Sequence, residues 1–497
     1  MNTTTKIPSA RFGKIELGPE AFRQLGYALV DRISQHLDEV AEGPVTMAPT
    51  AEAIGEMIGK ISSAAPDGQE AGILLENTAE LLFRQSLFNG HPKFWGYITS
   101  SPTPIGILGD LLASAVNANV GAWALSPVAT EIEKQTVEWI GRFMGYPAGG
   151  GLMVSGGNMA NNVGFQAAIR AKAGPQILEG GLRSLDKPLT AYCSGQTHTW
   201  IQKSASLCGL GANSIRWIDT DAEGRMSLEH LHGQIQKDIA AGYEPFLVVG
   251  TAGSVSTGVV DPLAGIAEIC KQYKLWFHID GAYGGFAGAL PELQGQFKGL
   301  ESADSIAVDP HKWLYAPLEA GCTLVRDPRH LTNTFSYHPP YYNFEAEQLN
   351  YVDYGPQNSR GFRALKVWLA AQHLGMEGYR QLIREDIQLA QYAFELFSGQ
   401  DDFETFSRHL SIATFRYVPP ALKPRLGDEA VEAHLNQMNQ AILNRIEAEG
   451  KYFISKAMIG GRFALRMCIV NFRSSAEDVE GFPAYVRALG QAEGSAR

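Results

Sequence analysis

The chain has 497 residues, of which 45% are hydrophobic and 19% are charged, and its formal net charge is −11. This length exceeds one ordinary hydrophobic core, and the composition excludes an intrinsically disordered protein. The negative charge argues against a nucleic-acid-binding protein, which would normally present a basic face. The five cysteines are scattered without CxxC spacing, which favours reduced thiols over a disulfide framework or a zinc site.

The N-terminal region is predicted to be helical. Apolar residues recur at helical spacing in residues 18–40, and such a face must be buried against the body of the protein or a partner subunit. The first twenty residues contain no apolar core of a signal peptide, and no apolar run approaches the roughly 20 residues that span a bilayer. We therefore expect a cytoplasmic protein without a membrane segment.

The middle of the chain alternates strand-like and helix-like segments. This alternation predicts an α/β domain in which helical crossovers connect parallel strands. Helical stretches such as 161–174 and 263–274 separate the short apolar runs. The predicted strands lie at 188–194, 214–218, 245–251, 275–280, 305–309 and 322–327.

The last hundred residues change character and predict a small α+β unit. Helical patterns at 386–398 and 432–450 are mixed with strand-like runs at 412–419, 451–459 and 462–470. The expected division of the chain is an N-terminal helical segment (1–100), a large α/β domain (101–380) and a small C-terminal α+β domain (381–497).

Four features suited to ligand binding follow the predicted strands. Ligands of an open parallel sheet bind beyond the carboxyl ends of its strands. There the sequence has a Gly-rich turn at 155–158 that leads into a helix, then His198, Asp280 and Lys312. Small residues at a helix start let backbone N–H groups approach a phosphate. Each feature alone is commonplace, but together they are the parts that bind pyridoxal phosphate.

Pyridoxal phosphate needs a lysine for its Schiff base, a carboxylate at its ring nitrogen and a helix start for its phosphate. In "VDPHKWLY", Lys312 is predicted to be the nucleophilic amine, and the adjacent His311 is suited to bind phosphate. Asp280 is predicted to keep the ring nitrogen protonated, with His198 as a platform for the ring. The alternative for Lys312 is a surface residue beside chance aromatic residues.

From about Phe22 to Arg473 the sequence resembles the group II pyridoxal-phosphate decarboxylases, which act on aromatic amino acids, histidine, glutamate or cysteine sulfinate. "HPKFWGYITSSPTPIGILGDLL", "WALSPVATEIE", "HIDGAYGGFAG", "VDPHKW" and "GFRALKVW" stand in that family's order and spacing. The resemblance implies the fold type I (aspartate-aminotransferase-like) architecture, a mostly parallel sheet with helices on both faces plus a small C-terminal α+β domain. It also implies a homodimer with active sites at the interface, in which the N-terminal segment packs on the partner.

The resemblance also assigns roles to single residues. Lys312 resembles the family's Schiff-base lysine, Asp280 the partner of the ring nitrogen and His198 the histidine stacked on the ring. Ala282 resembles the residue beneath the other face of the ring. The family often has serine or threonine where this chain has Asn158 and Val255, which leaves the details of phosphate binding open. The expected phosphate-binding residues are Gly156, Gly157, Asn158 and His311, with Ser254 or Ser305 as helpers.

In this family a tyrosine on a loop after the lysine is associated with protonation of the product's α-carbon. Alignment places Tyr341, 29 residues after Lys312, at that position, and Tyr342 fits one residue out of register. Relatives with phenylalanine there make aldehydes with oxygen, so Tyr341 together with His198 favours simple decarboxylation. The alternative is that a tyrosine-rich loop supplies one at this position by chance.

Substrate choice is predicted from segments that line the substrate side chain's pocket in relatives. An apolar, aromatic lining favours an aromatic amino acid, because a buried carboxylate would need a compensating cation. Lys93 or Arg466 would provide that cation for an acidic substrate, and the lining residues are otherwise ordinary interface core. An aldehyde synthase, an aminotransferase and a catalytically silent homologue remain alternatives. The expected lining residues are Trp95, Tyr97, Ser100, Trp123 and Leu125.

Overall fold

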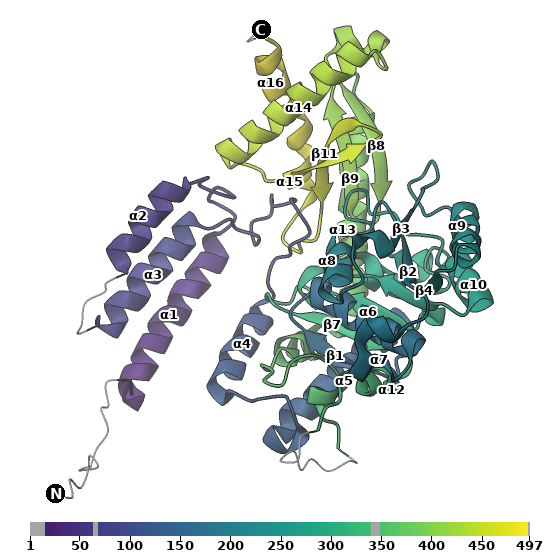
Figure 1. Ribbon diagram of the computed structural model, residues 1–497. Coiled ribbons are helices and arrows are strands. Elements are labelled where there is room, and N and C mark those ends of the chain that lie inside the picture. The colour runs from purple at the N-terminus through teal and green to yellow at the C-terminus, as the bar shows by residue number, and fades with distance from the viewer. Residues whose placement is uncertain (1–14, 63–67, 339–347, 496–497) are drawn as a thin grey trace, which may run out of the picture.

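The computed structural model describes residues 15–62, 68–338 and 348–495. N-terminal helices stand to one side, a seven-stranded sheet forms the body, and a four-stranded sheet with its own helices lies at the C-terminal end (Figure 1). Within the described ranges, no helix has the length and apolar character needed to cross a membrane.

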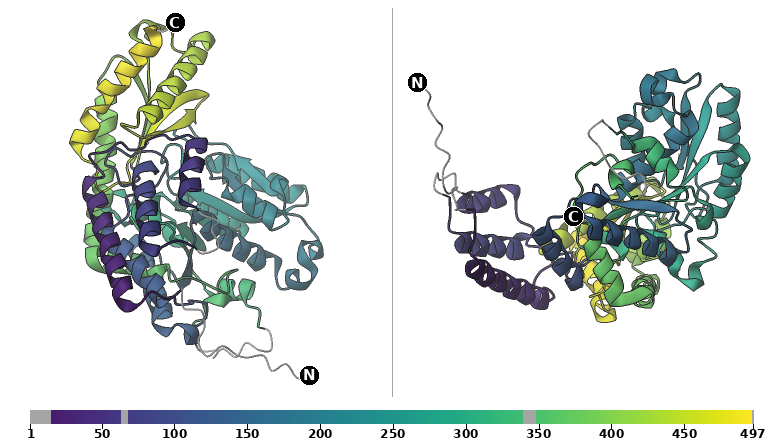
Figure 2. Two further views of the ribbon diagram at one scale, coloured as in Figure 1. Left: turned by 90° about the vertical axis from the view of Figure 1, so that its left-hand side faces the viewer. Right: turned by 90° about the horizontal axis from the view of Figure 1, so that it is seen from below.

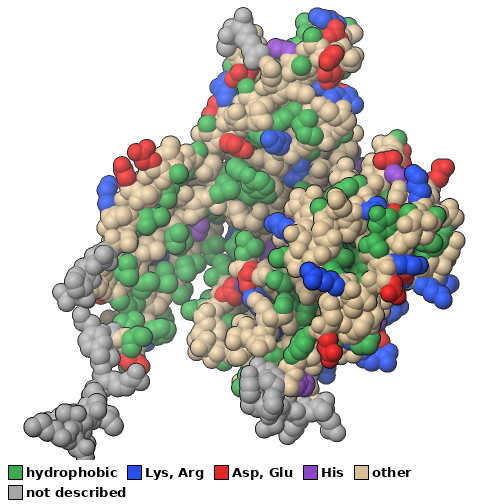
Figure 3. Space-filling view, viewed as in Figure 1, with side chains coloured by type: hydrophobic (Ala, Val, Ile, Leu, Met, Phe, Trp, Pro, Cys, Tyr) green, Lys and Arg blue, Asp and Glu red, His purple; other side chains and the backbone are tan. Residues whose placement is uncertain are grey.

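The N-terminal helices form a layer beside the body rather than on its sheet (Figures 1 and 2). The helix predicted at 18–40 is confirmed as α1, but none of its residues is fully buried. Phe22 is 63% exposed, and hydrophobic side chains gather over this part of the surface (Figure 3). The four helices are α1 (Pro19–Glu39), α2 (Ala51–Ile61), α3 (Ala71–Gln85) and α4 (Pro104–Val116).

The body contains one sheet with strand order β1-β7-β6-β5-β4-β2-β3. The strands from β6 to β3 are mutually parallel, whereas β7 is antiparallel to both β6 and β1. All six predicted strands are confirmed. The strands are β1 (Gly150–Val154), β2 (Leu189–Ser194), β3 (Ile215–Ile218), β4 (Glu244–Thr251), β5 (Trp276–Asp280), β6 (Ser305–Val308) and β7 (Gly321–Val325).

Helices cover both faces of this sheet, as a parallel sheet of buried apolar strands requires. One core contains Phe165, Ile201 and Leu331 from α6, α8 and α12, and the other contains residues of α5, α9, α10 and α13. The predicted fold class is therefore confirmed. The helices are α5 (Pro127–Met144), α6 (Gly157–Ala173), α7 (Ile177–Gly180), α8 (Trp200–Leu207), α9 (Leu228–Ala240), α10 (Leu263–Tyr273), α11 (Pro310–Trp313), α12 (Arg329–Phe335) and α13 (Ala364–Ser398).

The C-terminal unit is an antiparallel sheet of order β10-β11-β9-β8 packed against helices. Three of its strands and its central helix were predicted, whereas β8 was not. Its elements are β8 (Phe403–His409), β9 (Ile412–Tyr417), α14 (Glu429–Glu449), β10 (Ser455–Ile459), β11 (Arg462–Cys468), α15 (Ala476–Glu480) and α16 (Phe482–Ser495).

A buried ion pair ties four segments of the body together. The Arg360 guanidinium, 3% exposed, pairs with the fully buried Glu133 of α5. It also donates to the carbonyl oxygens of Val120 and Met153, both at 2.7 Å. Glu133 in turn accepts the Met153 N–H at 2.9 Å. Strand β1, helix α5 and the segments around residues 120 and 360 thus share one charge pair.

We expect Glu133→Gln to destabilise the fold by on the order of 3 kcal/mol, because it leaves a buried guanidinium without its counter-charge. The change would be measured as a lower thermal or urea midpoint. Glu292→Gln, which disrupts the exposed pair between Glu292 and Arg384, is the matched control and should alter the midpoint far less. Equal effects of the two substitutions would show that the buried pair is not a special determinant of stability.

Candidate active site

The carboxyl ends of neighbouring strands bring the predicted site residues to one edge of the sheet. Thr251 at the end of β4 pairs with Asp280 at the end of β5, and Asp280 pairs with Ala307 of β6. Strand β1 runs in the same direction as β6, because two successive antiparallel pairings separate them. The turn after β1 and the turn after β6 therefore open at the same edge.

The turn after β1 forms an open start of helix α6. This 17-residue helix begins at Gly157, and no side chain caps it. A Cβ added to Gly156 would lie 3.2 Å from the His311 ring, and one added to Gly157 would lie 2.7 Å from an Asp309 carboxylate oxygen. Glycines here leave the helix start accessible, so the helix dipole and free N–H groups can bind a phosphate. Asn158 follows on the exposed side.

Lys312 lies in α11, the short turn after β6. Its Nζ is 3.0 Å from Asp309 Oδ2, and its side chain is 20% exposed. The neighbouring Trp313 is fully buried and stacks on Tyr283 with ring centroids 4.9 Å apart. The lysine is therefore a partly buried amine in a site and not a surface residue.

His311 lies between the lysine and the helix start. Its Nδ1 accepts the Ala320 N–H at 3.1 Å, and its Nε2 is 3.6 Å from Asp309. Burial lowers the His311 pKa below its usual range, and the Lys312 ammonium also lowers it, whereas Asp309 raises it. The ring is therefore predominantly neutral at neutral pH and can donate to a phosphate through Nε2.

Asp280 is held in place by two donors. Its Oδ2 accepts the Trp200 indole N–H at 2.7 Å, and its Oδ1 accepts the Ala282 backbone N–H at 3.2 Å. Ala282 itself adjoins Gly157, whose added Cβ would lie 3.0 Å from that of Ala282. Sequence reasoning missed Trp200, although it stands two residues after His198 in "THTW".

His198 lies at the exposed mouth of the same group. Partial burial lowers its pKa below the usual range, and the Lys312 and Lys203 ammonium groups add to this, whereas Asp280 and Asp309 raise it. The imidazole is thus within electrostatic reach of both the amine and the carboxylate of the site. Its Nδ1 accepts the backbone N–H of Trp200 at 3.3 Å.

Of the two serines predicted to assist phosphate binding, Ser305 does not reach the site. It is fully buried at the first position of β6, where it bonds Trp276 Nε1 at 2.8 Å and His278 Nδ1 at 2.7 Å. This position is at the opposite end of the strand from Lys312, so the prediction for Ser305 is wrong. Ser254 follows β4 at the correct edge, is buried and bonds the Thr257 hydroxyl at 2.9 Å.

The predicted substrate-pocket residues separate into two groups. Trp95 has no exposed surface, packs on Tyr452 and Phe482 and donates to Ser474, so it belongs to the core of the C-terminal unit instead. Its large apolar ring is buried because this segment runs beneath that unit. The remaining residues are Tyr97 (58% exposed), Ser100 (buried, donating to the His311 carbonyl), Trp123 (half-buried) and Leu125 (59% exposed).

The prediction for Tyr341 lies outside the described residues. Arg466, in contrast, is well defined. It is 2% exposed, and its Nη1 donates to the Tyr97 carbonyl and to the Ser455 hydroxyl. Its Nε and Nη2 are buried and have no hydrogen-bond partner among the described residues.

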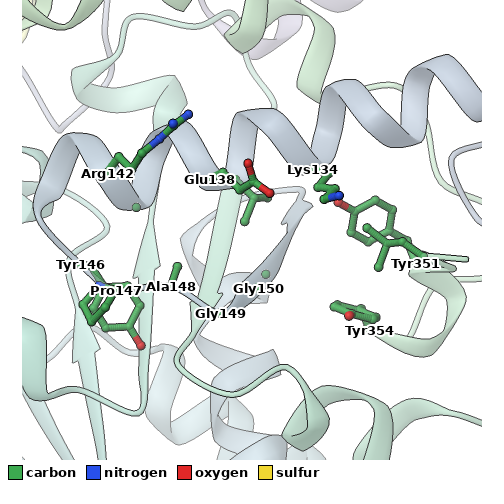
Figure 4. A pocket seen from close by; sticks show the side chains of 14 residues that line it. Lys134, Glu138, Arg142, Tyr146, Pro147, Ala148, Gly149, Gly150, Tyr351 and Tyr354 are labelled. Atoms are coloured by element: carbon green, nitrogen blue, oxygen red, sulfur yellow. The ribbon is translucent and has the colours of Figure 1, made fainter. Parts of the chain in front are cut away.

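A separate pocket of about 500 Å³ lies at the amino end of β1 (Figure 4). Lys134, Glu138 and Arg142 project from α5 over it, with Tyr351 and Tyr354 on another side. None of the predicted site residues lines this pocket, and it is at the opposite end of β1 from the turn that precedes α6. We therefore assign the candidate active site to the carboxyl edge of the sheet.

A partly buried amine, a carboxylate and an uncapped helix start at this edge of the sheet are the groups that a pyridoxal-phosphate enzyme needs. The chain belongs to the family described as "Pyridoxal-dependent decarboxylase conserved domain", which matches residues 55–418. It is thus a pyridoxal-phosphate-dependent amino-acid decarboxylase, a carboxy-lyase.

Curated relatives match over nearly the whole chain. An aromatic-L-amino-acid decarboxylase of Bacillus atrophaeus is 31% identical over 96% of this chain and 97% of its own. Tyrosine decarboxylase 3 of Petroselinum crispum is 30% identical over 94% of this chain and 91% of its own. A phenylacetaldehyde synthase of Petunia hybrida is 29% identical over 91% of each chain.

Solved structures agree with this assignment. The structure of mouse CSAD has a TM-score of 0.90 and 26% identity, covering 95% of this chain and 99% of that one. The structure of Oryza sativa TDC with PLP and tryptamine has a TM-score of 0.87 and 27% identity, covering 96% and 99%. The family's cofactor therefore fits the residues found here.

The Lys312 turn rests on a buried acid, Asp386 of α13. Its Oδ2 accepts the Trp313 indole N–H at 2.8 Å and the Tyr315 hydroxyl at 2.6 Å. Burial raises the Asp386 pKa to about 7, although the bonds from Tyr315, Trp313 and the Asn471 N–H lower it. The Asp386 carboxyl group therefore holds its proton more tightly in the folded state than in the unfolded chain, whose aspartates titrate near pH 4.

The contribution of this proton to stability is full below about pH 4 and is lost as the pH rises to about 7. We expect Asp386→Asn, which mimics the neutral acid, to lose less melting temperature than the wild type between pH 5 and pH 8. Thermal unfolding at both pH values measures this difference. Asp219→Asn, at a side chain that is 83% exposed, is the control. Identical pH dependence in wild type and Asp386→Asn would contradict the assignment of the buried proton.

Proposed function

We propose that this enzyme converts an aromatic L-amino acid to its amine and carbon dioxide, with pyridoxal phosphate bound covalently by Lys312. The observation that carries the assignment of the site is the Lys312 amine, partly buried beside the uncapped start of α6 and near the carboxylate of Asp280. The names of the Bacillus and Petroselinum relatives support an aromatic substrate.

Bound pyridoxal phosphate supplies an aldehyde for amines and an electron-poor ring that accepts the electron pair left when carbon dioxide departs. The Gly156–Gly157 turn and the neutral His311 would hold its phosphate. Asp280, fixed by Trp200, would hold a proton on the ring nitrogen, and the charge pair would be strengthened by its dry surroundings. His198 and Ala282 would confine the ring from its two faces.

An aromatic side chain would be bound by partly exposed rings of the segments that are predicted to line the pocket. Tyr97 and Trp123 have free apolar surface, and aromatic rings bury large areas at such positions. Leu125, 59% exposed, would extend this surface. Trp95 is excluded from this proposal because the core of the C-terminal unit already surrounds it.

A second candidate is decarboxylation of an acidic amino acid. The buried Arg466 guanidinium favours it, because two of its nitrogens have no partner in the described part of the chain and a carboxylate would satisfy both. Aldehyde formation, the activity named for the Petunia relative, is the third possibility. These three candidates differ in their substrates and products, so one assay distinguishes them.

The deciding experiment is a substrate panel that quantifies carbon dioxide, amine, aldehyde and peroxide for every reaction. The panel would contain the twenty amino acids, DOPA, 5-hydroxytryptophan and cysteine sulfinate. Amine from aromatic substrates alone supports the proposal. Turnover confined to glutamate, aspartate or cysteine sulfinate would replace it with the second candidate, and aldehyde as the main product would replace it with the third.

We further infer a homodimer in which the N-terminal helices pack on the partner subunit. The layer of α1 to α4 carries large apolar side chains that one chain leaves exposed, including Phe22, Tyr27, Leu108 and Val116. Exposed apolar area of this extent is characteristic of an interface. A cytoplasmic location accords with the five free cysteines, since reducing compartments keep thiols unpaired.

Lys312→Ala should fold but lose covalent attachment of the cofactor, and amine formation should fall by more than about 10²-fold. The intact mass after borohydride treatment measures attachment: the wild type should gain the mass of one reduced cofactor, and the variant should gain none. Lys203→Ala, which removes another nearby ammonium, is the matched control and should keep the added mass. Covalent attachment to Lys312→Ala would refute the assignment of this lysine.

Tyr341→Phe tests the reaction as well as the site. If the Tyr341 hydroxyl delivers the proton to the product's α-carbon, its loss should lower amine formation by about 10²–10⁴-fold. Oxygen would then intercept the unprotonated carbon, so aldehyde, ammonia and peroxide should rise while carbon dioxide release changes much less. Amine and aldehyde measured in one reaction decide the matter, with Tyr337→Phe as a control. An unchanged rate of amine formation without aldehyde would show that another group delivers the proton.

A further inference from the structure

We propose that Asp309 is the resident counter-ion of the cofactor site, and that its carboxylate couples cofactor binding to the uptake of one proton. In the cofactor-free protein this carboxylate neutralises the Lys312 ammonium. When the phosphate enters, one ammonium faces two anionic groups, and a proton shared between carboxylate and phosphate restores the charge balance. The inference rests on the proposed attachment of the cofactor at Lys312 and of its phosphate at the start of α6.

The side chain of Asp309 does not cap the helix that it precedes. The residue occupies the N-cap position of α11, where an aspartate normally accepts backbone N–H groups of the helix that it precedes. Its side chain makes no such bond. It is instead 1% exposed, with Oδ2 turned toward the first residue of α6 and 3.0 Å from Lys312 Nζ.

Its second oxygen is more unusual. Asp309 Oδ1 is buried and has no hydrogen-bond partner among the described residues. An unsatisfied buried carboxylate oxygen is costly and calls for an explanation. An acceptor beside a phosphate site gains its missing donor when a proton bridges it to a phosphate oxygen, and such O–H···O⁻ bonds are short and strong.

The charge balance requires that proton. The free cofactor's phosphate is largely a dianion above pH 7, since its second ionisation occurs near pH 6. When a phosphate-bearing ligand that does not react with Lys312 is bound, the single Lys312 ammonium faces both the Asp309 carboxylate and the phosphate. Two anionic groups in a buried site then repel each other, and this repulsion favours protonation of one of them.

Other titratable groups face Asp309 from each neighbouring element. They are His198 after β2, His311 and Lys312 of α11, and Cys322 of β7, while Asp280 at the end of β5 acts on the same His198. The pKa values of both histidines are lowered, chiefly by burial, and burial raises that of Cys322 well above its usual value. These three groups therefore stay neutral between pH 7 and pH 8.5, where the proposed proton uptake is measured.

The test is calorimetric titration of the apoenzyme between pH 7 and pH 8.5, in two phosphate-free buffers with different ionisation enthalpies. The probe is pyridoxine phosphate, which carries the phosphate but has no aldehyde to react with Lys312. We expect the wild type to take up close to one proton and its Kd to rise by up to about tenfold per pH unit. Pyridoxine, which lacks both the phosphate and the aldehyde, should show no such uptake.

Asp309→Asn removes the charge and keeps the size of the side chain. We expect it to take up almost no proton and to bind pyridoxine phosphate more tightly than the wild type at pH 8.5. Asp304→Asn, at the opposite end of β6, is the matched control and should behave as the wild type. Proton uptake equal to that of the wild type in Asp309→Asn, or weaker binding at pH 8.5, would overturn the proposal.

The wild-type measurement tests the proposal even if the variant does not fold. Pyridoxine phosphate that binds the wild type without proton uptake refutes the role of Asp309. That outcome differs from failure of the proposed function, in which pyridoxal phosphate would leave no borohydride-stable mass on Lys312. The two failures are therefore distinguishable in one preparation.

Discussion

The hydrogen bonds that Asp386 accepts from Trp313 and Tyr315 fix the orientation of the turn that carries the lysine. Both aromatic side chains are fully buried. Lys312, which precedes them, is instead paired with Asp309, whose carboxylate faces the start of α6. The Asn471 N–H donates to the other oxygen of Asp386, and Asn471 also contacts Ser101. The lysine turn, the segment before α4 and the C-terminal unit therefore meet at one buried carboxylate.

The charged side chains of the site, Asp280 and Lys312, are also held by specific partners. A buried charge is tolerated only when it is paired or hydrogen-bonded. Asp280 obtains its bonds from Trp200 and the Ala282 backbone, and Lys312 obtains its counter-charge from Asp309. Every charge that the cofactor brings must fit into this existing balance. The strand ends thus determine both where the cofactor lies and which protonation states it can adopt there.

The sequence was sufficient to predict the strands of the body and the residues that follow them, because an uninterrupted apolar run is a strong signal for a buried strand. Prediction from the sequence failed for residues whose role depends on how deeply they are buried or on which end of a strand they occupy. Ser305 was assigned to the site although it begins its strand, and Trp95 was assigned to a pocket although its ring lies in a core. Strand β8, "FETFSRH", lacks such a run because polar residues interrupt it at the edge of its sheet. Asp309 belongs to the motif "VDPHKW", where the sequence alone would suggest a helix cap. The structure shows instead that its side chain does not cap α11 and faces the start of α6.

Cofactor chemistry and substrate choice are held by different parts of the molecule. His198, Asp280 and Lys312 follow strands that are paired on both sides, whereas the turn that starts α6 follows the edge strand β1. Tyr97, in contrast, adopts a left-handed backbone (φ 51°), which is uncommon for a residue with a side chain, and Arg466 holds its carbonyl oxygen. The segment around residues 97–100 is therefore held by Arg466 of the C-terminal unit at one end and by the Ser100 hydrogen bond to the His311 carbonyl at the other. Tyr97 is thus held by Arg466, whereas the lysine turn is anchored on Asp386. Relatives about 30% identical to this chain have names as different as tyrosine decarboxylase and phenylacetaldehyde synthase, so overall similarity does not by itself fix the product.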